Sequence, residues 1–445
     1  MASRFPGEPF SPDRLPDPVA PVEGVDAVFP AIYRAAVVGA DSYRATRSAL
    51  RRDGPILRLG NRFVSLDRFR EIAFLALGSA SISQTLAATS ALGESITQGL
   101  VIGPDALPTE VPFHHRVVPV RPSPAVAESA AAEALELARG LGERDLLIVL
   151  LSAGATGYLS EPPAGIPAAE WADRIREFTL SGASSRESAL LVRVLGLGGV
   201  GGRLAGVTRA ETAALVVDRG DGAELVGGGP TCAVTAEERV ELRAALERTG
   251  HLTRLPPALR GELTPAATAL PGGGPSFTRP VSIIGPADAL REAGEAAQAK
   301  RWKPMLADLH LAGDPGAAAT RMVTRTEELF QSSPPTATPG RSRPPRGLAT
   351  FAATTLAVPE GGDEGAAIDR FLAAAAGQLP WRGASVAALR TAGAPSSARP
   401  PGAVRRVGTD PRGRAASGIH SLRMRPGVTD VGVIVVCAVP ATGAE

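Results

Sequence analysis

The feature that most constrains the fold of this chain is an apolar run at 146–151, where six consecutive residues are Leu, Ile or Val. A strand that is apolar on both faces has to be covered on both sides, as a central strand of a parallel sheet is. Similar short apolar runs recur along the chain and alternate with longer segments of helical periodicity. This alternation predicts an α/β protein with mostly parallel sheets flanked by helices, in a Rossmann-like arrangement.

The expected elements follow from the apolar periodicity and from the Gly and Pro residues that interrupt it. The expected strands are 72–77, 100–102, 116–120, 146–151, 213–217, 281–284, 305–311, 348–358, 386–389 and 431–439. The expected helices are 31–52, 82–92, 125–141, 168–180, 187–195, 236–248, 287–300, 317–330 and 366–379. Strands and helices alternate almost to the end of the chain, so the same architecture is expected throughout.

Stretches rich in Pro and Gly divide the chain into parts. Six prolines between Pro6 and Pro21 forbid regular structure, so residues 1–30 are predicted to form an extended N-terminal arm. The Pro-, Gly- and Thr-rich stretch 264–280 indicates a linker. We therefore expect an α/β domain at 31–275 and a smaller α/β domain at 276–445.

Composition excludes several classes of partner and site. The 47 basic and 45 acidic residues nearly balance, which argues against nucleic acid as a partner. The apolar runs are far shorter than a membrane span and the first residues show no apolar signal segment, so we expect no membrane partner and a cytoplasmic location. Cys232 and Cys437 cannot make a disulfide framework, and His114-His115 lacks a third zinc ligand at useful spacing.

The loop that follows the run at 146–151 is a candidate ligand-binding loop. Ligands bind to parallel sheets at the loops that leave the carboxyl ends of the strands. This loop reads Ser152-Ala-Gly-Ala-Thr-Gly157, and small residues here allow a close backbone approach to an anion at a helix N-terminus. A tight turn without a ligand accounts for the same residues, and both interpretations stay open.

Short motifs follow one another in a fixed order along the chain. They are Phe74-Leu-Ala-Leu-Gly-Ser-Ala80, Arg121-Pro-Ser-Pro-Ala125, the strand and loop at 145–157, Ser181-Gly-Ala-Ser184, Val192-Arg193, Gly201-Gly202, Leu215-Val-Val-Asp-Arg-Gly-Asp221 and Gly229-Pro-Thr231. In order and spacing they resemble motifs of the class II glycerate kinases, the glycerate 2-kinase family with a C-terminal MOFRL domain. A fainter similarity continues to Thr429-Asp430.

The resemblance implies a Rossmann-like domain, a smaller MOFRL-like domain, and an ATP- and Mg²⁺-dependent transfer of a phosphoryl group to a hydroxyl of glycerate. The pocket candidates that it implies are Ser79, Ser152, Gly154, Thr156, Arg193, Gly201, Gly202, Asp218, Asp221 and Thr231. Asp218 and Asp221 are also candidate metal ligands through their carboxylate oxygens. An Asx turn is the alternative interpretation of the two aspartates, and a structural role is the alternative for Arg193.

The chain departs from the family where positive charge is needed. The family's lysines fall at Ser79, Val194 and Val200, and the whole chain holds only two lysines, Lys300 and Lys303. Phosphoryl transfer depends on cations around the transferred group, so no catalytic residue of the family is expected to be intact. ATP and Mg²⁺ are expected as ligands only if the ancestral site is retained.

Two functions remain open on these grounds. The first is a catalytically decayed glycerate kinase-like protein that acts as a binding or partner subunit, associated with an intact relative or with itself. The alternative is an active transferase on glycerate or another small hydroxy acid, which uses a rearranged set of the same pocket candidates.

Overall fold

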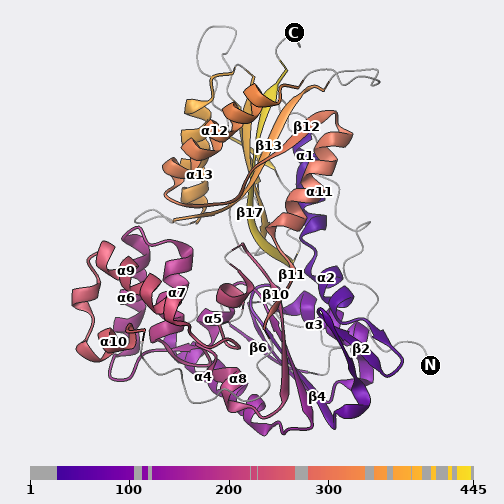
Figure 1. Cartoon of the computed structure of the whole chain (residues 1–445), viewed down its shortest axis with the longest axis vertical. Helices are drawn as coiled ribbons and strands as arrows, with labels where there is room; N and C mark the ends of the chain where they lie inside the picture. The colour runs from indigo at the N-terminus through magenta and orange to yellow at the C-terminus, as the bar shows by residue number, and fades with distance from the viewer. Residues whose placement is uncertain are drawn as a thin grey trace. The chain divides into compact units, whose positions relative to one another are not determined.

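The computed structural model of the chain describes residues 28–104, 113–118, 123–220, 222–227, 229–265, 279–335, 345–357, 364–381, 383–392, 402–406, 419–422 and 428–441. The described residues form two compact units (Figure 1). Unit 1 contains the described residues of 42–284, and unit 2 contains 28–41 together with those of 285–441.

Unit 1 is built on a six-stranded sheet in the order β11-β10-β7-β4-β5-β6, in which all neighbouring strands run parallel. The strands are β4 (Glu71–Leu77), β5 (Gln98–Gly103), β6 (His114–Val117), β7 (Asp145–Leu151), β10 (Glu211–Val217) and β11 (Val281–Ile284). Every residue of β7 is buried, and β7 pairs with β4 on one side and with β10 on the other. The buried central strand predicted at 146–151 is confirmed.

Helices cover both faces of this sheet, as predicted for an α/β fold. The helices of unit 1 are α2 (Ser42–Ala49), α3 (Ser81–Leu92), α4 (Pro124–Gly140), α5 (Ala155–Tyr158), α6 (Ala168–Leu180), α7 (Ser185–Leu195), α8 (Arg203–Val207), α9 (Ala236–Arg248) and α10 (Pro257–Glu262). Successive residues of a strand point to opposite faces. Ile148 accordingly lies in a core with α2 and α3, whereas Val149 lies in a core with α4, α5 and α8.

Three additions to unit 1 lie outside this three-layer arrangement. Helices α6, α7, α9 and α10 share an apolar core of their own, which includes Trp171 and Phe178. Strands β1 (Arg52–Asp53), β2 (Ile56–Leu59) and β3 (Arg62–Ser65) form a small antiparallel sheet that the sequence did not predict. Strands β8 (Ser160–Glu161) and β9 (Leu197–Gly198) form a further antiparallel pair.

Unit 2 contains a second six-stranded sheet, in the order β12-β13-β17-β14-β15-β16. The strands are β12 (Trp302–Gly313), β13 (Gly347–Leu356), β14 (Ser385–Ala392), β15 (Gly402–Arg406), β16 (Ile419–Leu422) and β17 (Val428–Pro440). Strands β12 and β13 pair in parallel, whereas the other four pairs are antiparallel. This corrects the expectation of mostly parallel sheets in both domains. The described chain passes from β14 to β17 without a helix, and parallel pairing requires a crossover that antiparallel pairing does not.

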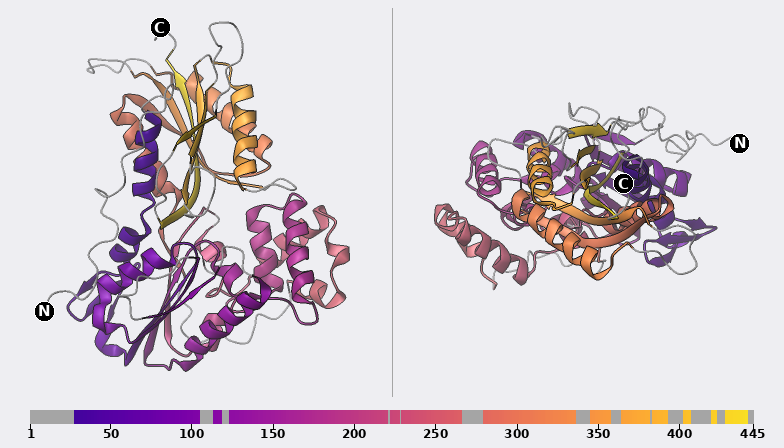
Figure 2. Two further views of the ribbon diagram at one scale, coloured as in Figure 1. Left: turned by 180° about the vertical axis from the view of Figure 1, so that it is seen from behind. Right: turned by 90° about the horizontal axis from the view of Figure 1, so that it is seen from above.

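Helices also cover both faces of the second sheet (Figure 2). Helices α12 (Pro315–Ser332) and α13 (Glu364–Gln378) pack on one face, around Phe371 and Val435. The other face carries α11 (Pro286–Ala299) and α1 (Val28–Gly39), which pack closely together. A Cβ on Gly39 would lie 2.7 Å from the Asp288 carbonyl oxygen, so the end of α1 touches the backbone of α11.

The expected helix at 31–52 and the expected domain boundary both differ from the structure. Helices α1 and α2 are separate, because α1 packs within unit 2 and α2 packs on α3 within unit 1. Strand β11, expected in the C-terminal domain at 276–445, instead pairs with β10 in the unit 1 sheet. Sequence alone could not assign β11, because a four-residue apolar strand fits the edge of either sheet.

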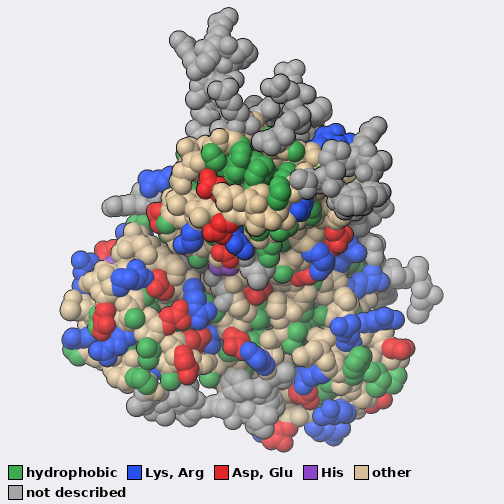
Figure 3. Space-filling model, turned by 45° about the horizontal axis from the view of Figure 1, so that its top comes forward, with side chains coloured by type: hydrophobic (Ala, Val, Ile, Leu, Met, Phe, Trp, Pro, Cys, Tyr) green, Lys and Arg blue, Asp and Glu red, His purple; other side chains and the backbone are tan. Residues whose placement is uncertain are grey.

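Basic and acidic side chains occur together over the molecular face drawn in Figure 3. Among the helices in the described part of the chain, none combines the length and apolarity needed to cross a membrane.

Candidate functional site

Three of the pocket candidates follow neighbouring strands at the carboxyl edge of the unit 1 sheet. Strands β4, β7 and β10 are neighbours, and they lead into Ser79, Ser152 and Asp218 respectively. Because the carboxyl ends of parallel strands lie along one edge of a sheet, residues distant in the chain meet there. The structure therefore gives these three candidates a common location.

Ser152 is fully buried and joins the ends of two neighbouring strands. Its Oγ donates a hydrogen bond to the Leu77 carbonyl oxygen at 3.0 Å and accepts one from the Ala80 amide at 2.9 Å. Gly78 has φ +110°, and a Cβ at this position would collide with Ser152. The Ser152 hydroxyl is thus satisfied by the backbone of its own chain.

The loop after β7 forms a tight turn into the single-turn helix α5. Gly154 begins α5 in the left-handed conformation, with φ +88°, and the Ser79 amide donates to the Ala153 carbonyl oxygen at 2.9 Å. The Thr156 Oγ1 is buried and has no hydrogen-bond partner in the described structure. A Cβ on Gly229 would lie 2.6 Å from that oxygen, so the Gly229 backbone covers it directly.

The Gly201-Gly202 turn packs against the segment that begins at Gly229. The two glycines have φ +66° and +84°, and the Gly202 amide donates to the Gly229 carbonyl oxygen at 2.9 Å. A Cβ on Gly202 would lie 2.7 Å from the Cys232 backbone. Thr231, in the same segment, is buried. Glycine is required at 202 both by its φ and by this close backbone contact.

Arg193, on α7, is almost completely enclosed, with 1% of its side chain exposed. Its Nη2 donates to the Ala233 carbonyl oxygen at 3.0 Å, and its Nη1 donates to the Glu224 carbonyl oxygen. Its Nη2 also lies 3.3 Å from Glu238 Oε2, which makes an ion pair with α9. In this arrangement Arg193 cross-links parts of unit 1. This is the structural role that was the alternative interpretation of Arg193.

Asp218 stabilises the turn after β10. Its Oδ1 accepts hydrogen bonds from the Gly220 amide at 2.9 Å and from the Gly222 amide at 3.2 Å, which is the Asx-turn arrangement. Asp221, its partner as a candidate metal ligand, lies outside the described residues. In the described ranges, no three His, Cys, Asp or Glu residues are grouped to hold a metal ion. Asp218 thus holds a turn together, and its role as a metal ligand with Asp221 stays a prediction.

Neither cysteine is a reactive thiol in this environment. Burial raises the pKa of the Cys232 thiol to about 11, against the smaller opposing effect of the Arg193 charge. Burial likewise raises the pKa of Cys437, on β17, to about 12. The thiolate is the nucleophilic form, so we expect both side chains to react slowly near neutral pH.

Sequence reasoning did not identify Glu238 as the partner of Arg193. The signal present at Glu238 was that of a capping box with Thr235, and both of its hydrogen bonds form, at 3.0 and 3.2 Å. The ion pair with Arg193 carries no local signal, because the two residues lie far apart in the chain.

A two-unit α/β protein, with small-residue loops gathered at the carboxyl edge of a parallel sheet, is the class that this fold and site define. The sequence model of the family described as "Domain of unknown function (DUF4147)" matches residues 28–264, more than half of the chain. The chain belongs to this family. As its motifs indicated, it is a member of the glycerate kinase family.

Individual relatives agree with this assignment. A protein of Danio rerio named glycerate kinase is 26% identical over 218 residues, which are 45% of this chain and 43% of that protein. The matched region thus spans less than half of the relative's length. The crystal structure of a glycerate kinase from Thermotoga maritima is similar in fold, with a TM-score of 0.62 and 18% identity over 93% of this chain and 98% of that one. The PH0495 protein from Pyrococcus horikoshii has a TM-score of 0.61 and 17% identity over 95% and 100%.

Proposed function

We propose that this chain is a catalytically decayed glycerate kinase, which no longer transfers a phosphoryl group from ATP to glycerate. It acts instead as a binding or partner subunit in the cytoplasm, associated with an intact relative or with itself. The observation that carries this proposal is that three polar pocket candidates are engaged by their own chain. Ser152 and Asp218 bind backbone groups, and Arg193 binds both backbone and a carboxylate.

The neutral residues at the positions of the family's lysines support the same conclusion. At the positions of the family's lysines, Ser79 is neutral, and Val194 and Val200 are buried apolar residues. Arg193 is the one cation among the pocket candidates, and its charge is paired with Glu238. Removal of one stabilising donor costs about 10²–10³ in rate, so the loss of several is consistent with no turnover.

The direct test is turnover of ATP with Mg²⁺ and glycerate by the purified chain. We expect no glycerate-dependent rate above background, with an active glycerate kinase assayed in parallel as the positive control. A turnover number of about 1–100 per second, as kinases have, would overturn the proposal. The alternative of an active transferase with a rearranged site would then stand.

A gain-of-binding variant tests whether the edge has kept its ancestral shape. Ser79 is half-buried, so Ser79→Lys places an ammonium at the carboxyl end of β4. Val200 is unsuitable for the same change, because it is fully buried in a core and a lysine there would be a buried charge. We expect calorimetric titration to detect an ATP analogue with Ser79→Lys but not with the wild type.

Ser181→Lys is the matched control, because Ser181 is exposed in a loop of the same unit. It should bind the nucleotide no better than the wild type does. Equal nucleotide affinity in the wild type and in Ser79→Lys would mean that other residues form a working site.

The partner role is tested by the mass of the chain in solution. Light scattering of the chain alone, and mixed with an active glycerate kinase of the same cell, should show a homo- or hetero-oligomer. A monomer under both conditions would contradict this part of the proposal while leaving the loss of activity intact.

A further inference from the structure

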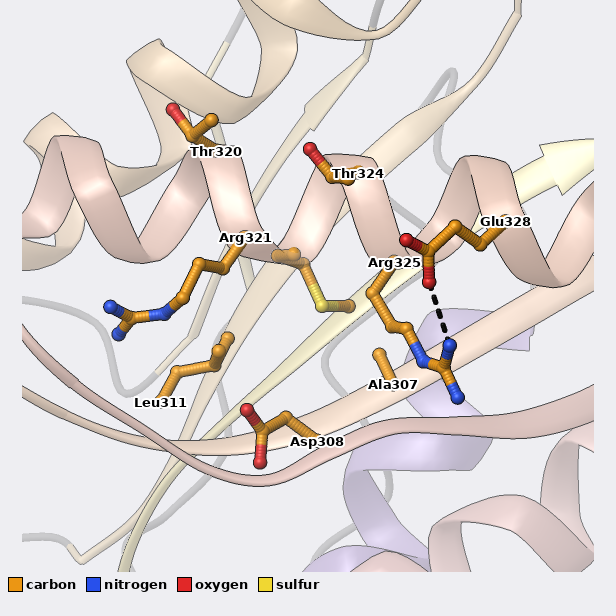
Figure 4. A pocket seen from close by; sticks show the side chains of 9 residues that line it. Ala307, Asp308, Leu311, Thr320, Arg321, Thr324, Arg325 and Glu328 are labelled. Atoms are coloured by element: carbon orange, nitrogen blue, oxygen red, sulfur yellow. Dashed lines mark hydrogen bonds and ion pairs between the residues drawn. The ribbon is translucent and has the colours of Figure 1, made fainter.

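A cavity of about 480 Å³ lies within unit 2, between helix α12 and strand β12 (Figure 4). It is lined by residues of these two elements, so it is separate from the candidate site of unit 1. Its volume falls in the range of small-molecule sites. Nothing in the argument for a decayed kinase uses these residues.

The floor of the cavity is apolar. Leu311 of β12 and Met322 of α12 line it, and each has 1% of its surface exposed. These side chains belong to the core of unit 2, so their position is fixed by packing.

Charged side chains surround the floor and are not fully paired with one another. Arg325 forms an ion pair with Glu328 at 2.7 Å, so these two charges compensate each other. Asp308 and Arg321, in contrast, have no oppositely charged partner among the described residues. Figure 4 shows Asp308 on the strand, with Arg321 and Arg325 reaching from the helix on either side of it.

Both unpaired groups are held in place by one contact that leaves other polar atoms available. Arg321 Nη2 donates to the Ala312 carbonyl oxygen at 2.6 Å, which leaves Nη1 and Nε available to bind a ligand. Asp308 Oδ1 accepts a hydrogen bond from the His310 amide at 3.0 Å, which leaves Oδ2 available to bind a ligand. A cation and an anion pre-oriented beside one cavity favour a ligand that carries both opposite charges.

An irregularity of the strand contributes to this geometry. The pairing of β12 with β13 shifts register between Leu306 and Asp308, and again between Asp308 and Leu311. Bulges of this kind re-aim side chains and are common next to binding sites. Asp308 lies between the two shifts.

We propose that this cavity binds a zwitterionic α-amino acid. The carboxylate of the ligand pairs with Arg321, and its ammonium group pairs with Asp308. The protein charges are exposed and their ion pairs correspondingly weak, so we expect a dissociation constant on the order of 1 mM. The proposal is independent of whether unit 1 is catalytically active.

The first test uses the full wild-type chain and a matched series of ligands. Saturation-transfer NMR should detect L-leucine, and the signal should saturate below about 10 mM. The analogue without the ammonium group, 4-methylpentanoate, and the analogue without the carboxylate, 3-methylbutylamine, should each bind about tenfold more weakly. No saturation by L-leucine, or equal affinity for either analogue, would overturn the proposal.

The second test uses variants. Asp308→Asn and Arg321→Gln should each weaken L-leucine binding about tenfold. Arg291→Gln, at an exposed arginine of α11 in the same unit, is the control and should leave binding unchanged. L-Leucine binding that is insensitive to Asp308→Asn and Arg321→Gln would contradict the assignment. So would inorganic phosphate that competes with L-leucine and binds equally well in Asp308→Asn, because the cavity would then be an anion site.

Discussion

The guanidinium of Arg193 and the carboxylate of Glu238 form an ion pair that is almost excluded from solvent, with 3.3 Å between Nη2 and Oε2. Removing two charges from water is costly, and such a pair persists where hydrogen bonds satisfy its remaining polar atoms. Here the carbonyl oxygens of Glu224 and Ala233 accept from Nη1 and Nη2, whereas the buried Nε has no hydrogen-bond partner among the described residues. A guanidinium engaged in this way is not available to a substrate, so the packing of unit 1 bears directly on its function.

Replacement of Arg193 should therefore cost stability. In Arg193→Met we expect the free energy of unfolding to fall by about 3–5 kcal/mol, because Glu238 becomes a buried charge without a partner. Arg186→Met on the same helix is the control, since the ion pair of Arg186 with Glu241 is 39% and 37% exposed and should be worth at most about 1 kcal/mol. Urea unfolding measures both, and equal losses would contradict the structural role of Arg193.

The close approach of the two glycine motifs predicts a second destabilising change. Gly202→Ala should cost about 1–2 kcal/mol for the left-handed backbone and a further 1–3 kcal/mol for the collision with Cys232. Gly165→Ala has the same backbone requirement, φ +80°, but no atom within 4 Å, and should cost only the first amount. Thermal unfolding compares the two variants, and the contact argument fails if they lose the same stability.

The environment of Asp145 predicts that the stability of the folded protein depends on pH. Burial by itself raises the pKa of this carboxyl, but hydrogen bonds from the Gly142 amide and from Arg70 outweigh it, so its pKa lies below the ordinary 3.8. A carboxyl with a lowered folded-state pKa stabilises the protein above its unfolded-state pKa, and this contribution is lost as the pH falls through the folded-state value.

Asp145→Asn should therefore be less stable than the wild type at neutral pH. The difference in the free energy of unfolding should shrink as the pH falls below about 4. Urea unfolding at a series of pH values measures it. A difference that stays constant down to about pH 2 would contradict the lowered pKa.

The cysteines should resist alkylation in the native protein. With a pKa of about 11, the Cys232 thiol holds a far smaller thiolate fraction near pH 8 than a free cysteine does. We expect iodoacetamide to modify Cys232 at least about 100-fold more slowly than it modifies the chain unfolded in urea. Mass spectrometry follows the modification, and rapid labelling of Cys232 in the folded chain would contradict its raised pKa.

Local pattern was sufficient for much of unit 1. The apolar run of β7 and the helical periodicities of α3, α4, α6 and α9 depend on nearby residues alone, and these elements formed where they were expected. The antiparallel pairing in unit 2 was not predictable in the same way. Pairing direction depends on which strands become neighbours, and the neighbours of β17 are the non-consecutive strands β13 and β14.

The sequence by itself determined the α/β class, the order of motifs that identifies the family, and the absence of lysine at Ser79, Val194 and Val200. These are properties of residue type and spacing, which are written along the chain. Only the tertiary structure decided that Ser152 binds the end of β4 and that Arg193 is enclosed against Glu238. The physical reason is that a polar side chain serves a ligand or its own fold according to the partners that packing brings to it, and those partners come from distant parts of the chain.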